Sequence, residues 1–229
     1  MFTLENVVPW GRSFDEYRHM FALTERDLQS TIVGCADGPA SFNAEATERG
    51  MTVVSCDPLY GLTASQIQDR ITATSHEVLE QARRNADDFV WETIRSVEEL
   101  GRVRMDAMRR FLQDYDAGRD ERRYIDAELP VLPFPDASFD LALCANFLFL
   151  YAGHLDERFH LAAVREMCRV ATEVRIFPLL ALGNRPSPFV DPVVDALRQA
   201  GYSAAIETVP YEFQKGGNQM LRITPGSSR

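Results

Sequence analysis

The chain of 229 residues is 45% hydrophobic and 25% charged, proportions typical of a globular protein with one large α/β domain. Its formal net charge of −10 argues against a nucleic-acid partner. No apolar run approaches the about 20 residues of a membrane-spanning helix, and the N-terminus lacks a signal-peptide pattern, so we expect a cytoplasmic protein without a membrane segment.

The first part of the chain predicts a helical segment followed by a βαβ unit. Residues 1–30 form a helical lead-in, or cap, that contains SFDEYRHMFAL with Ser13 as its N-cap. Residues 31–35 and 52–56 are strand candidates rich in β-branched side chains, and residues 41–49 between them predict a helix. Strand, tight loop, helix and strand in this order are the repeating unit of a parallel sheet.

Residues 63–115 interrupt the alternation with a strongly helical stretch. Its apolar side chains recur at steps of about three and four, which predicts one continuous helical face: Leu79, Ala82, Ala86, Phe89, Trp91, Ile94, Val97 and Leu100. The stretch is much longer than an ordinary crossover helix. We interpret it as a helical insertion, or lid, within a single domain of residues 1–229.

The alternation of strands and helices resumes after this insertion. The strand candidates are RYIDA, FDLALCANF, EVRIFPLL, SAAIETV and QMLRIT, with helices predicted at residues 154–170 and 189–200. We expect a doubly wound, Rossmann-like α/β sandwich of three layers. Its mostly parallel seven-stranded sheet should end in an antiparallel strand and bind ligands outside the carboxyl ends of the strands.

The loop GCADGPASF follows the first predicted strand. Small residues there let a ligand approach the backbone, and the next helix presents unpaired N–H groups. Asp57 ends the second strand, 19 positions after Gly38, where an acid can accept hydrogen bonds from both hydroxyls of a ribose. Dinucleotide binding requires G-x-G-x-x-G, whose third glycine is absent here, so an NAD-dependent oxidoreductase is the disfavoured alternative.

Several motifs together resemble the class I S-adenosylmethionine-dependent methyltransferases. GCADGPASF resembles their motif I, and LPVLPFPDASFDLALCANFLF resembles the passage that enters their fourth strand. PWGRSFDEY, DGPASFNAE and YEFQKGGNQM resemble a bacterial branch of unassigned substrate. The resemblance covers the chain apart from the insertion. It implies methyl transfer from S-adenosylmethionine, which yields S-adenosylhomocysteine, to a small-molecule acceptor by a monomer or homodimer.

The resemblance also implies a cofactor-binding role for residues at each strand end. They are Gly34, Cys35, Ala36, Asp37 and Gly38 beside the methionine portion and ribose; Asp57, Pro58 and Leu59 at the ribose and adenine; Asp126 and Ala127 at the adenine; and Asn146 and Phe147 near the methionine portion or the acceptor. Arg12 and Tyr17 lie in the lead-in that would close over the cofactor, and Arg12 would pair with its carboxylate.

Gly34 stands where motif I usually carries an acid. Asp37, three residues on, is one replacement for that acid; a lower cofactor affinity is a second explanation. A third is a degenerate motif in a non-catalytic S-adenosylmethionine-binding or protein-interaction domain. The sequence leaves all three open.

Catalysis of methyl transfer depends largely on positioning, and a base is needed only where the acceptor atom carries a proton. His154, which follows the fourth-strand motif, is a candidate base, and Tyr151 is a candidate for orienting the substrate. His160 is expected on an exposed helix face. We predict no metal site, because the cysteines lack CxxC spacing and those that end neighbouring strands are best explained as small buried residues: Cys35, Cys56 and Cys144.

Overall fold

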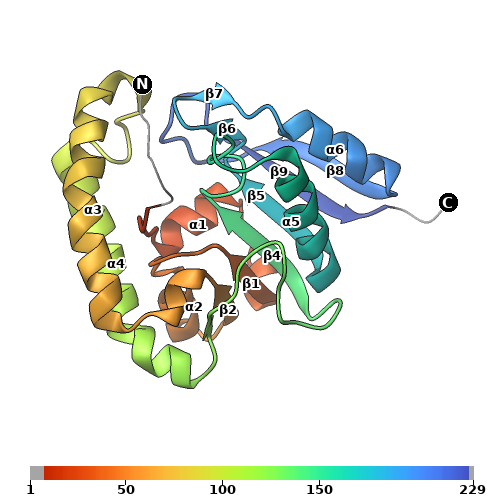
Figure 1. Ribbon diagram of the computed structural model, residues 1–229, viewed down its shortest axis with the longest axis horizontal. Helices are drawn as coiled ribbons and strands as arrows, with labels where there is room; N and C mark the ends of the chain where they lie inside the picture. Colours follow the sequence, from red (N-terminus) through yellow and green to blue (C-terminus); the bar gives the residue numbers. More distant parts are fainter. Residues whose placement is uncertain (1–7, 227–229) are drawn as a thin grey trace.

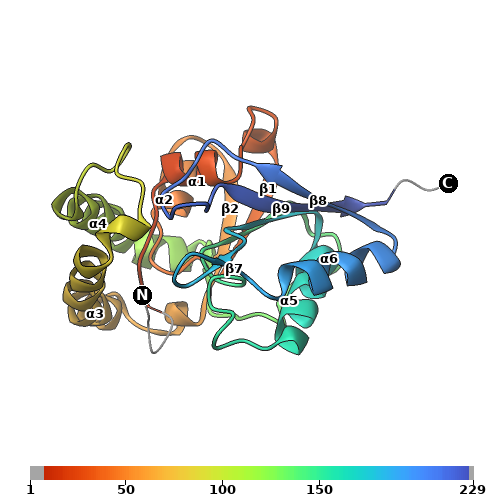
Figure 2. The same ribbon diagram turned by 90° about the horizontal axis from the view of Figure 1, so that it is seen from above.

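The computed structural model describes residues 8–226, in which one mixed sheet has helices on both faces (Figures 1 and 2). The strand order is β3-β2-β1-β4-β5-β9-β8, and β9 runs antiparallel to both of its neighbours while the other pairs are parallel. The strands are β1 (Thr31–Cys35), β2 (Thr52–Cys56), β3 (Tyr124–Ile125), β4 (Phe139–Ala145), β5 (Ala171–Phe177), β8 (Tyr202–Thr208) and β9 (Gln219–Pro225). This confirms the expected mostly parallel seven-stranded sheet with an antiparallel last strand.

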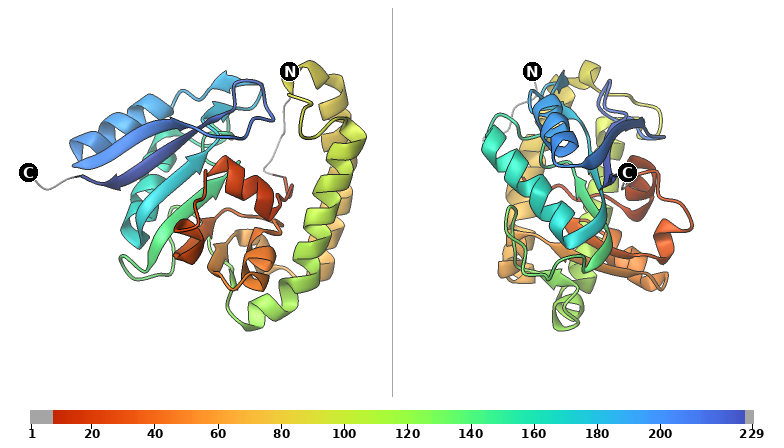
Figure 3. Two further views of the ribbon diagram at one scale, coloured as in Figure 1. Left: turned by 180° about the vertical axis from the view of Figure 1, so that it is seen from behind. Right: turned by 90° about the vertical axis from the view of Figure 1, so that its right-hand side faces the viewer.

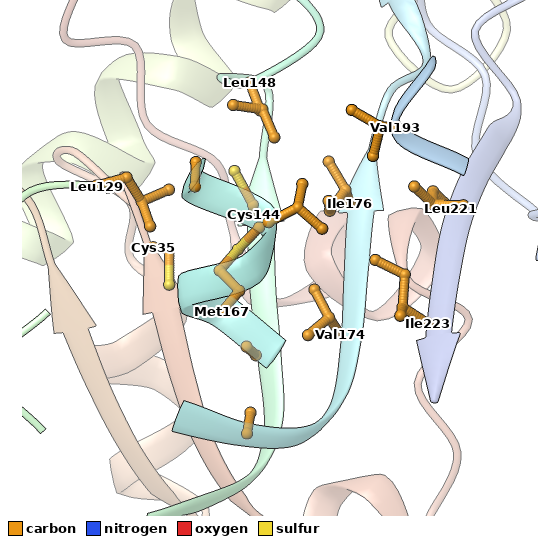
Figure 4. Close-up of a cluster of buried hydrophobic side chains, with 14 of the residues drawn as sticks. Cys35, Leu129, Cys144, Leu148, Met167, Val174, Ile176, Val193, Leu221 and Ile223 are labelled. Atoms are coloured by element: carbon orange, nitrogen blue, oxygen red, sulfur yellow. The ribbon is translucent and has the colours of Figure 1, made fainter. Parts of the chain in front are cut away.

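Helices cover the sheet in two layers. Figure 2 shows α1 (Phe14–Met20) and α2 (Phe42–Glu48) on one face, with α5 (Glu157–Val170) and α6 (Val190–Gln199) on the other. The central strands β1 and β4 are mostly apolar because both of their faces are covered. In β1, Ile32 packs with the α1 and α2 side, whereas Val33 and Cys35 belong to the cluster under α5 and α6 (Figure 4).

The insertion is a pair of long helices beside the sheet, α3 (Ala64–Arg84) and α4 (Val97–Asp120), as Figures 1 and 3 show. The prediction of one continuous helical face was wrong for residues 85–96, which form a loop with a single 3₁₀ turn at Ala86–Asp88. Local capping explains the break. The Asn85 side chain donates to the Gln81 carbonyl at 2.8 Å, and the Ser96 hydroxyl accepts from the Glu99 amide at 3.1 Å.

The apolar residues of that broken face are nevertheless packed together. Phe89 and Ile94 of the loop are buried in one cluster with Ala82, Val97 and Leu100 of the two helices. The spacing of the apolar residues therefore predicted correctly which side chains are buried, but it was wrong in predicting a helix there. The second helix also continues to Asp120, beyond the expected end of the insertion at residue 115.

Two local features differ from the expectations for the second half of the chain. The stretch EVRIFPLL is not one strand: β5 ends before Pro178, and Leu180–Ala181 pairs with Arg185–Pro186 as a separate small sheet, β6 and β7. His160 is fully buried rather than exposed. It lies on the sheet-facing side of α5, where its two ring nitrogens contact the carbonyl oxygens of Asp156 and Leu148 at 2.7 and 2.9 Å.

No helix within residues 8–226 is both long enough and apolar enough to cross a membrane.

Candidate functional site

A cavity of about 740 Å³ lies at the carboxyl ends of β1, β2, β3 and β4, between the sheet and the insertion. This is the place where open α/β sheets bind ligands. Most residues named from the sequence line it: Arg12, Tyr17, Ala36, Asp37, Gly38, Asp57, Pro58, Leu59, Ala127, Asn146, Phe147 and Tyr151. Gly34, Cys35, Asp126 and His154 are not among its lining residues.

The missing side chain of Gly34 makes room for Asp37. A Cβ at position 34 would lie 1.8 Å from Oδ2 of Asp37, so a larger residue would force that carboxylate to move. The Asp37 carboxylate is held in this space by two hydroxyl donors, Tyr17 at 2.8 Å and Ser55 at 2.6 Å. An acid is therefore present beside the end of β1, but it comes from the loop instead of the strand.

Burial controls the ionisation of Asp37. It raises the pKa of this carboxyl to about 6; the hydroxyls of Ser55 and Tyr17 oppose the rise, and the nearby Asp57 adds to it. A cation or further hydrogen-bond donor in the cavity would stabilise the ionised form.

Asp57 holds the loop after β1 in shape. Its two oxygens accept from the Gly38 amide at 2.9 Å and the Leu59 amide at 2.8 Å. Both Ala36 (φ 58°) and Gly38 (φ 54°) adopt left-handed backbone geometry, which glycine accepts freely and alanine only with strain. Burial raises the pKa of Asp57 to about 6, with Asp126 and Glu128 contributing. Each Asp57 oxygen keeps a lone pair for a further donor.

Buried tyrosines connect this loop to the insertion. The Tyr60 hydroxyl donates to the Gly38 carbonyl at 2.7 Å, and the Tyr115 hydroxyl of α4 donates to the Tyr60 carbonyl at 2.8 Å. Both rings belong to one aromatic cluster with Phe111 and Tyr124. The position of the loop after β1, which lines the cavity, therefore depends on the packing of α4.

A charged cluster is buried behind one wall of the cavity. Arg104 of α4 pairs with Glu16 of α1 at 2.5 Å, and Glu16 also accepts from the Tyr211 hydroxyl at 2.8 Å. Burial and the neighbouring Arg104 lower the pKa of Arg12, which lines the cavity. Arg12 itself donates to the Trp10 carbonyl and has no ion pair with Glu16 among the described residues, so this region holds two guanidinium groups but only one carboxylate.

Three nitrogen atoms of this cluster have no hydrogen-bond partner among the described residues. They are Nε of Arg12 and both Nε and Nη2 of Arg104. Buried guanidinium nitrogens without acceptors are costly, so the cluster suits an anionic group placed against Arg12.

The part of the cavity under the insertion is apolar. Its lining consists of Val78, Ala82, Phe89, Leu100, Leu150, Leu155, Leu182 and Phe213, which we call the apolar chamber. Val78 packs with Leu150 and Leu182, while Phe89 packs with Ala82 and Phe213.

Three loops meet at the apolar chamber in an arrangement that we call the clasp: residues 88–90, Asn184 and residues 213–215. The Val90 amide donates to the Phe213 carbonyl at 2.8 Å, and the Lys215 amide donates to the Asp88 carbonyl at 3.0 Å. The Asn184 side chain bridges the other two loops, donating to the Asp88 carbonyl and accepting from Gln214 at 3.1 Å. The rings of Phe89 and Phe213 stack at 4.9 Å.

The predicted site residues outside the lining have other surroundings. Asp126 is exposed, and a Cβ on Gly61 would lie 2.6 Å from its Oδ2. Cys35 is fully buried in the core with Cys144 (Figure 4), and burial raises the pKa of its thiol well above the ordinary value. His154 lies on an exposed turn, its ring 5.9 Å from that of Tyr151. Their functional roles stay predictions.

Tyr151 is buried in the cavity wall, where burial raises the pKa of its hydroxyl. That hydroxyl accepts from the Val8 amide at 3.4 Å. A neutral phenol in this position suits the orienting role expected from the sequence better than proton abstraction. No group of three or more potential metal ligands occurs within residues 8–226.

Sequence reasoning missed the side chains that support the site. Ser55 and Arg104 could have been found, because each is a polar residue in an otherwise apolar pattern: Ser55 in TVVSC, and Arg104 on the buried side of α4. Tyr211 and Phe213 lie in YEFQKGGN, and Trp10 lies in PWGRSFDEY. The resemblance included both stretches, but it assigned no role to these three side chains.

A doubly wound sheet with a small-residue loop after β1 and an acid after β2 defines a Rossmann-like fold, and its cavity lies where such sheets bind ligands. The chain is 34% identical over 222 residues to uncharacterized protein MJ0045 of Methanocaldococcus jannaschii, which covers 96% of this chain and 97% of that one. It belongs to the family of that protein. This relative is archaeal, so the bacterial branch stays a prediction. No family model matches the chain.

Solved structures resemble the chain only at a general level. The PH0226 protein of Pyrococcus horikoshii OT3 gives a TM-score of 0.49 at 12% identity, covering 93% of this chain and 89% of that one. Magnesium protoporphyrin IX methyltransferase of Synechocystis PCC 6803 with bound SAM gives 0.46 at 11% identity, covering 88% and 73%. Likeness of this degree carries no argument about function.

Proposed function

We propose that this chain binds S-adenosylmethionine at the carboxyl ends of β1, β2 and β4 and transfers its methyl group to a small-molecule acceptor. The observation that carries the proposal is the presence of Asp37, Asp57 and Arg12 in one cavity. These residues match the ammonium, the ribose hydroxyls and the carboxylate of a nucleoside that carries an amino acid.

The residues fit this ligand on grounds of charge and hydrogen bonding. Arg12 has an unpartnered buried Nε for a carboxylate, and together Arg12, Arg104 and Glu16 make two guanidinium groups and one carboxylate. The Asp37 carboxylate is poised for a cation because burial raises its pKa to about 6. Asp57 has lone pairs left for two hydroxyl donors.

When bound, S-adenosylmethionine supplies a methyl group on a positively charged sulfur. The chain contributes orientation and a neutral Tyr151 hydroxyl beside the acceptor. The electron pair of the broken carbon–sulfur bond stays on sulfur, the acceptor atom forms the new bond to carbon, and any proton it loses passes to solvent. Among the described residues lining the cavity there is no histidine, cysteine or lysine to serve as a base.

That lining also motivates a second candidate function. A non-catalytic S-adenosylmethionine-binding domain would need the same three residues and no base. Turnover with any acceptor, detected as S-adenosylhomocysteine release, excludes this second function.

Calorimetric titration tests the proposed function. We expect wild-type protein to bind S-adenosylmethionine and S-adenosylhomocysteine but not NAD. Arg12→Gln should weaken S-adenosylhomocysteine binding by about 10- to 100-fold, the value of one charged hydrogen-bonded contact. Arg18→Gln is the matched control, because Arg18 is an exposed arginine of α1 that pairs with Glu25.

Methylthioadenosine, which lacks the amino-acid portion, makes this test specific. Its affinity should be the same for the wild type and Arg12→Gln, since Arg12 would have no carboxylate to contact. Equal losses for both ligands would show that Arg12 supports the fold instead of the carboxylate. Binding of NAD in place of the other ligands would overturn the proposed function.

A further inference from the structure

The cavity divides into two regions of opposite character. Its ionisable residues other than tyrosine are Arg12, Asp37, Asp57, Glu128 and Arg70, of which the first four lie in the lead-in or just beyond strand ends and the last is exposed on α3. None of the eight described residues that define the apolar chamber is charged. Along α3, the lining extends from Arg70 to Ala82, about 18 Å at 1.5 Å per residue.

The cavity is large for a ligand site and extends well beyond the strand ends. Small-ligand sites span about 300–1,000 Å³, and this one measures about 740 Å³. A ligand held by Asp37, Asp57 and Arg12 would occupy the region at the strand ends. The apolar chamber would stay open to a second molecule.

Polar groups around the apolar chamber form hydrogen bonds with one another. The Asn184 amide spans the Asp88 carbonyl and the Gln214 side chain, and the Trp91 ring nitrogen donates to the Ala86 carbonyl at 2.8 Å. A charged molecule placed there would lose its hydration without gaining an ion-pair partner. The apolar chamber therefore selects against charge.

The walls of this region are rich in aromatic rings. Phe89 and Phe213 lie at the clasp, while Trp10, Phe147 and Tyr151 lie between the apolar chamber and the strand ends. Rings of this kind bind flat aromatic molecules through offset and edge-to-face contacts. Tyr151 provides a hydroxyl at the boundary with the strand-end region.

We infer that the acceptor is an uncharged aromatic molecule bound in the apolar chamber, with a hydroxyl or amino group at the edge that faces Tyr151. This inference rests on the proposed function, since it assigns the strand-end region to S-adenosylmethionine. It adds the chemical class of the second substrate.

Three probes with one aromatic frame and different charges test the inference. They are 4-phenylphenol (neutral), biphenyl-4-carboxylate (anionic) and 4-phenylbenzylamine (cationic), each titrated at pH 7 into protein saturated with S-adenosylhomocysteine. The neutral probe should bind at least about tenfold more tightly than either charged probe, because burying a charge without a partner is costly. A charged probe that binds equally well overturns the inference.

A pair of valine variants locates the bound probe. Val78→Thr replaces a buried methyl group of the apolar chamber by a hydroxyl, and Val131→Thr makes the same change at a side chain that is 73% exposed. Val78→Thr should weaken 4-phenylphenol binding about fivefold and Val131→Thr should leave it unchanged. Equal binding by Val78→Thr and the wild type would place the probe elsewhere and contradict the inference.

The two proposals fail in different ways. If S-adenosylhomocysteine binds but 4-phenylphenol does not, the acceptor class is wrong and the proposed function stands. If S-adenosylhomocysteine itself does not bind, the proposed function fails, and the inference that depends on it fails too.

Discussion

Gly34 and Asp37 act as one unit at the end of β1. The space that a side chain at position 34 would enter is filled by the Asp37 carboxylate, which Tyr17 and Ser55 hold by hydrogen bonds. Among the three explanations that the sequence left open, this geometry favours replacement of the motif acid by Asp37.

Gly34→Ala should displace the Asp37 carboxylate, because the new Cβ would start 1.8 Å from its Oδ2. We expect a loss of stability of about 1–3 kcal/mol, the usual cost of overpacking, and weaker binding of S-adenosylmethionine. Chemical denaturation and calorimetry measure the two effects. Gly153→Ala is the matched control, since no atom lies within 4 Å of the corresponding Cβ.

An exchange of the two residues separates loss of space from loss of charge. Asp37→Gly alone should weaken S-adenosylmethionine binding, and adding Gly34→Asp should restore part of it by returning a carboxylate to the same space. If the double variant binds no better than Asp37→Gly, the carboxylate of Asp37 is not a cofactor contact.

At the scale of elements, α4 and α1 are joined by a buried ion pair. Arg104→Met should lower the free energy of unfolding by about 3–5 kcal/mol, because it leaves Glu16 buried without its guanidinium partner. Glu16→Gln in the same chain should recover part of this loss. Arg102→Met removes an exposed arginine of α4 that pairs with Glu99, and its effect should stay below about 1 kcal/mol.

If Arg104→Met and Arg102→Met lower the free energy of unfolding by the same amount, this account of the buried ion pair is wrong. Denaturant unfolding gives both values, and an unchanged m-value would confirm that the comparison concerns the same two states.

Among the contacts that hold the insertion in place, those of the clasp should open most easily. Asn184→Gly removes the bridging side chain while keeping a residue that accepts the left-handed backbone at this position, where φ is 58°. We expect faster hydrogen exchange at the amides of Val90 and Lys215, whose bonds cross the clasp. Amides of α5 provide the internal reference, and equal acceleration there would indicate general destabilisation.

The sequence predicted best the strands whose apolar pattern has one physical cause, namely burial of both faces of the sheet. Most residues of β1, β2 and β4 are buried, so their short, largely apolar runs predict strands that are covered on both faces. Residues 85–96 were wrongly predicted to be helical. The apolar side chains of this loop are buried against α3 and α4, and their spacing along the sequence is the same as that of a buried helix face. Only the caps at Asn85 and Ser96 separate the two cases.

The candidate site was predictable where it follows strand ends and unpredictable where it depends on distant contacts. Asp37, Asp57 and Asn146 lie just beyond strands, so topology alone brings them together. The pairing of Arg104 with Glu16 joins residues 88 positions apart, and nothing local in either helix specifies it. The clasp is likewise built from three loops whose contacts no local pattern encodes.

For the whole molecule, burial of the two loop acids links stability to pH. The pKa values of Asp37 and Asp57 are about 6 in the folded chain, above the ordinary value of 3.8, so the folded state binds their protons more tightly than the unfolded state does. Their contribution to stability is fully present below pH 3.8 and is lost as pH rises through about 6. The free energy of unfolding of Asp37→Asn, relative to that of the wild type, should therefore be higher at pH 8 than at pH 5.

The expected difference in stability between pH 5 and pH 8 is about 1.4 kcal/mol, because only the one pH unit between pH 5 and the folded-state pKa of about 6 lies in this range, at 1.36 kcal/mol per unit. Chemical denaturation of wild type and Asp37→Asn at pH 5 and pH 8 measures it, with exposed Asp195→Asn as the control for removal of a charge.

The affinity for the ligand should depend on pH in the opposite direction to the stability of the fold. Because the ammonium and ribose hydroxyls would contact ionised carboxylates, S-adenosylhomocysteine should bind at least about tenfold more weakly at pH 5 than at pH 7. A pH-independent affinity alongside a pH-dependent stability would mean that the two acids shape the loop without touching the ligand.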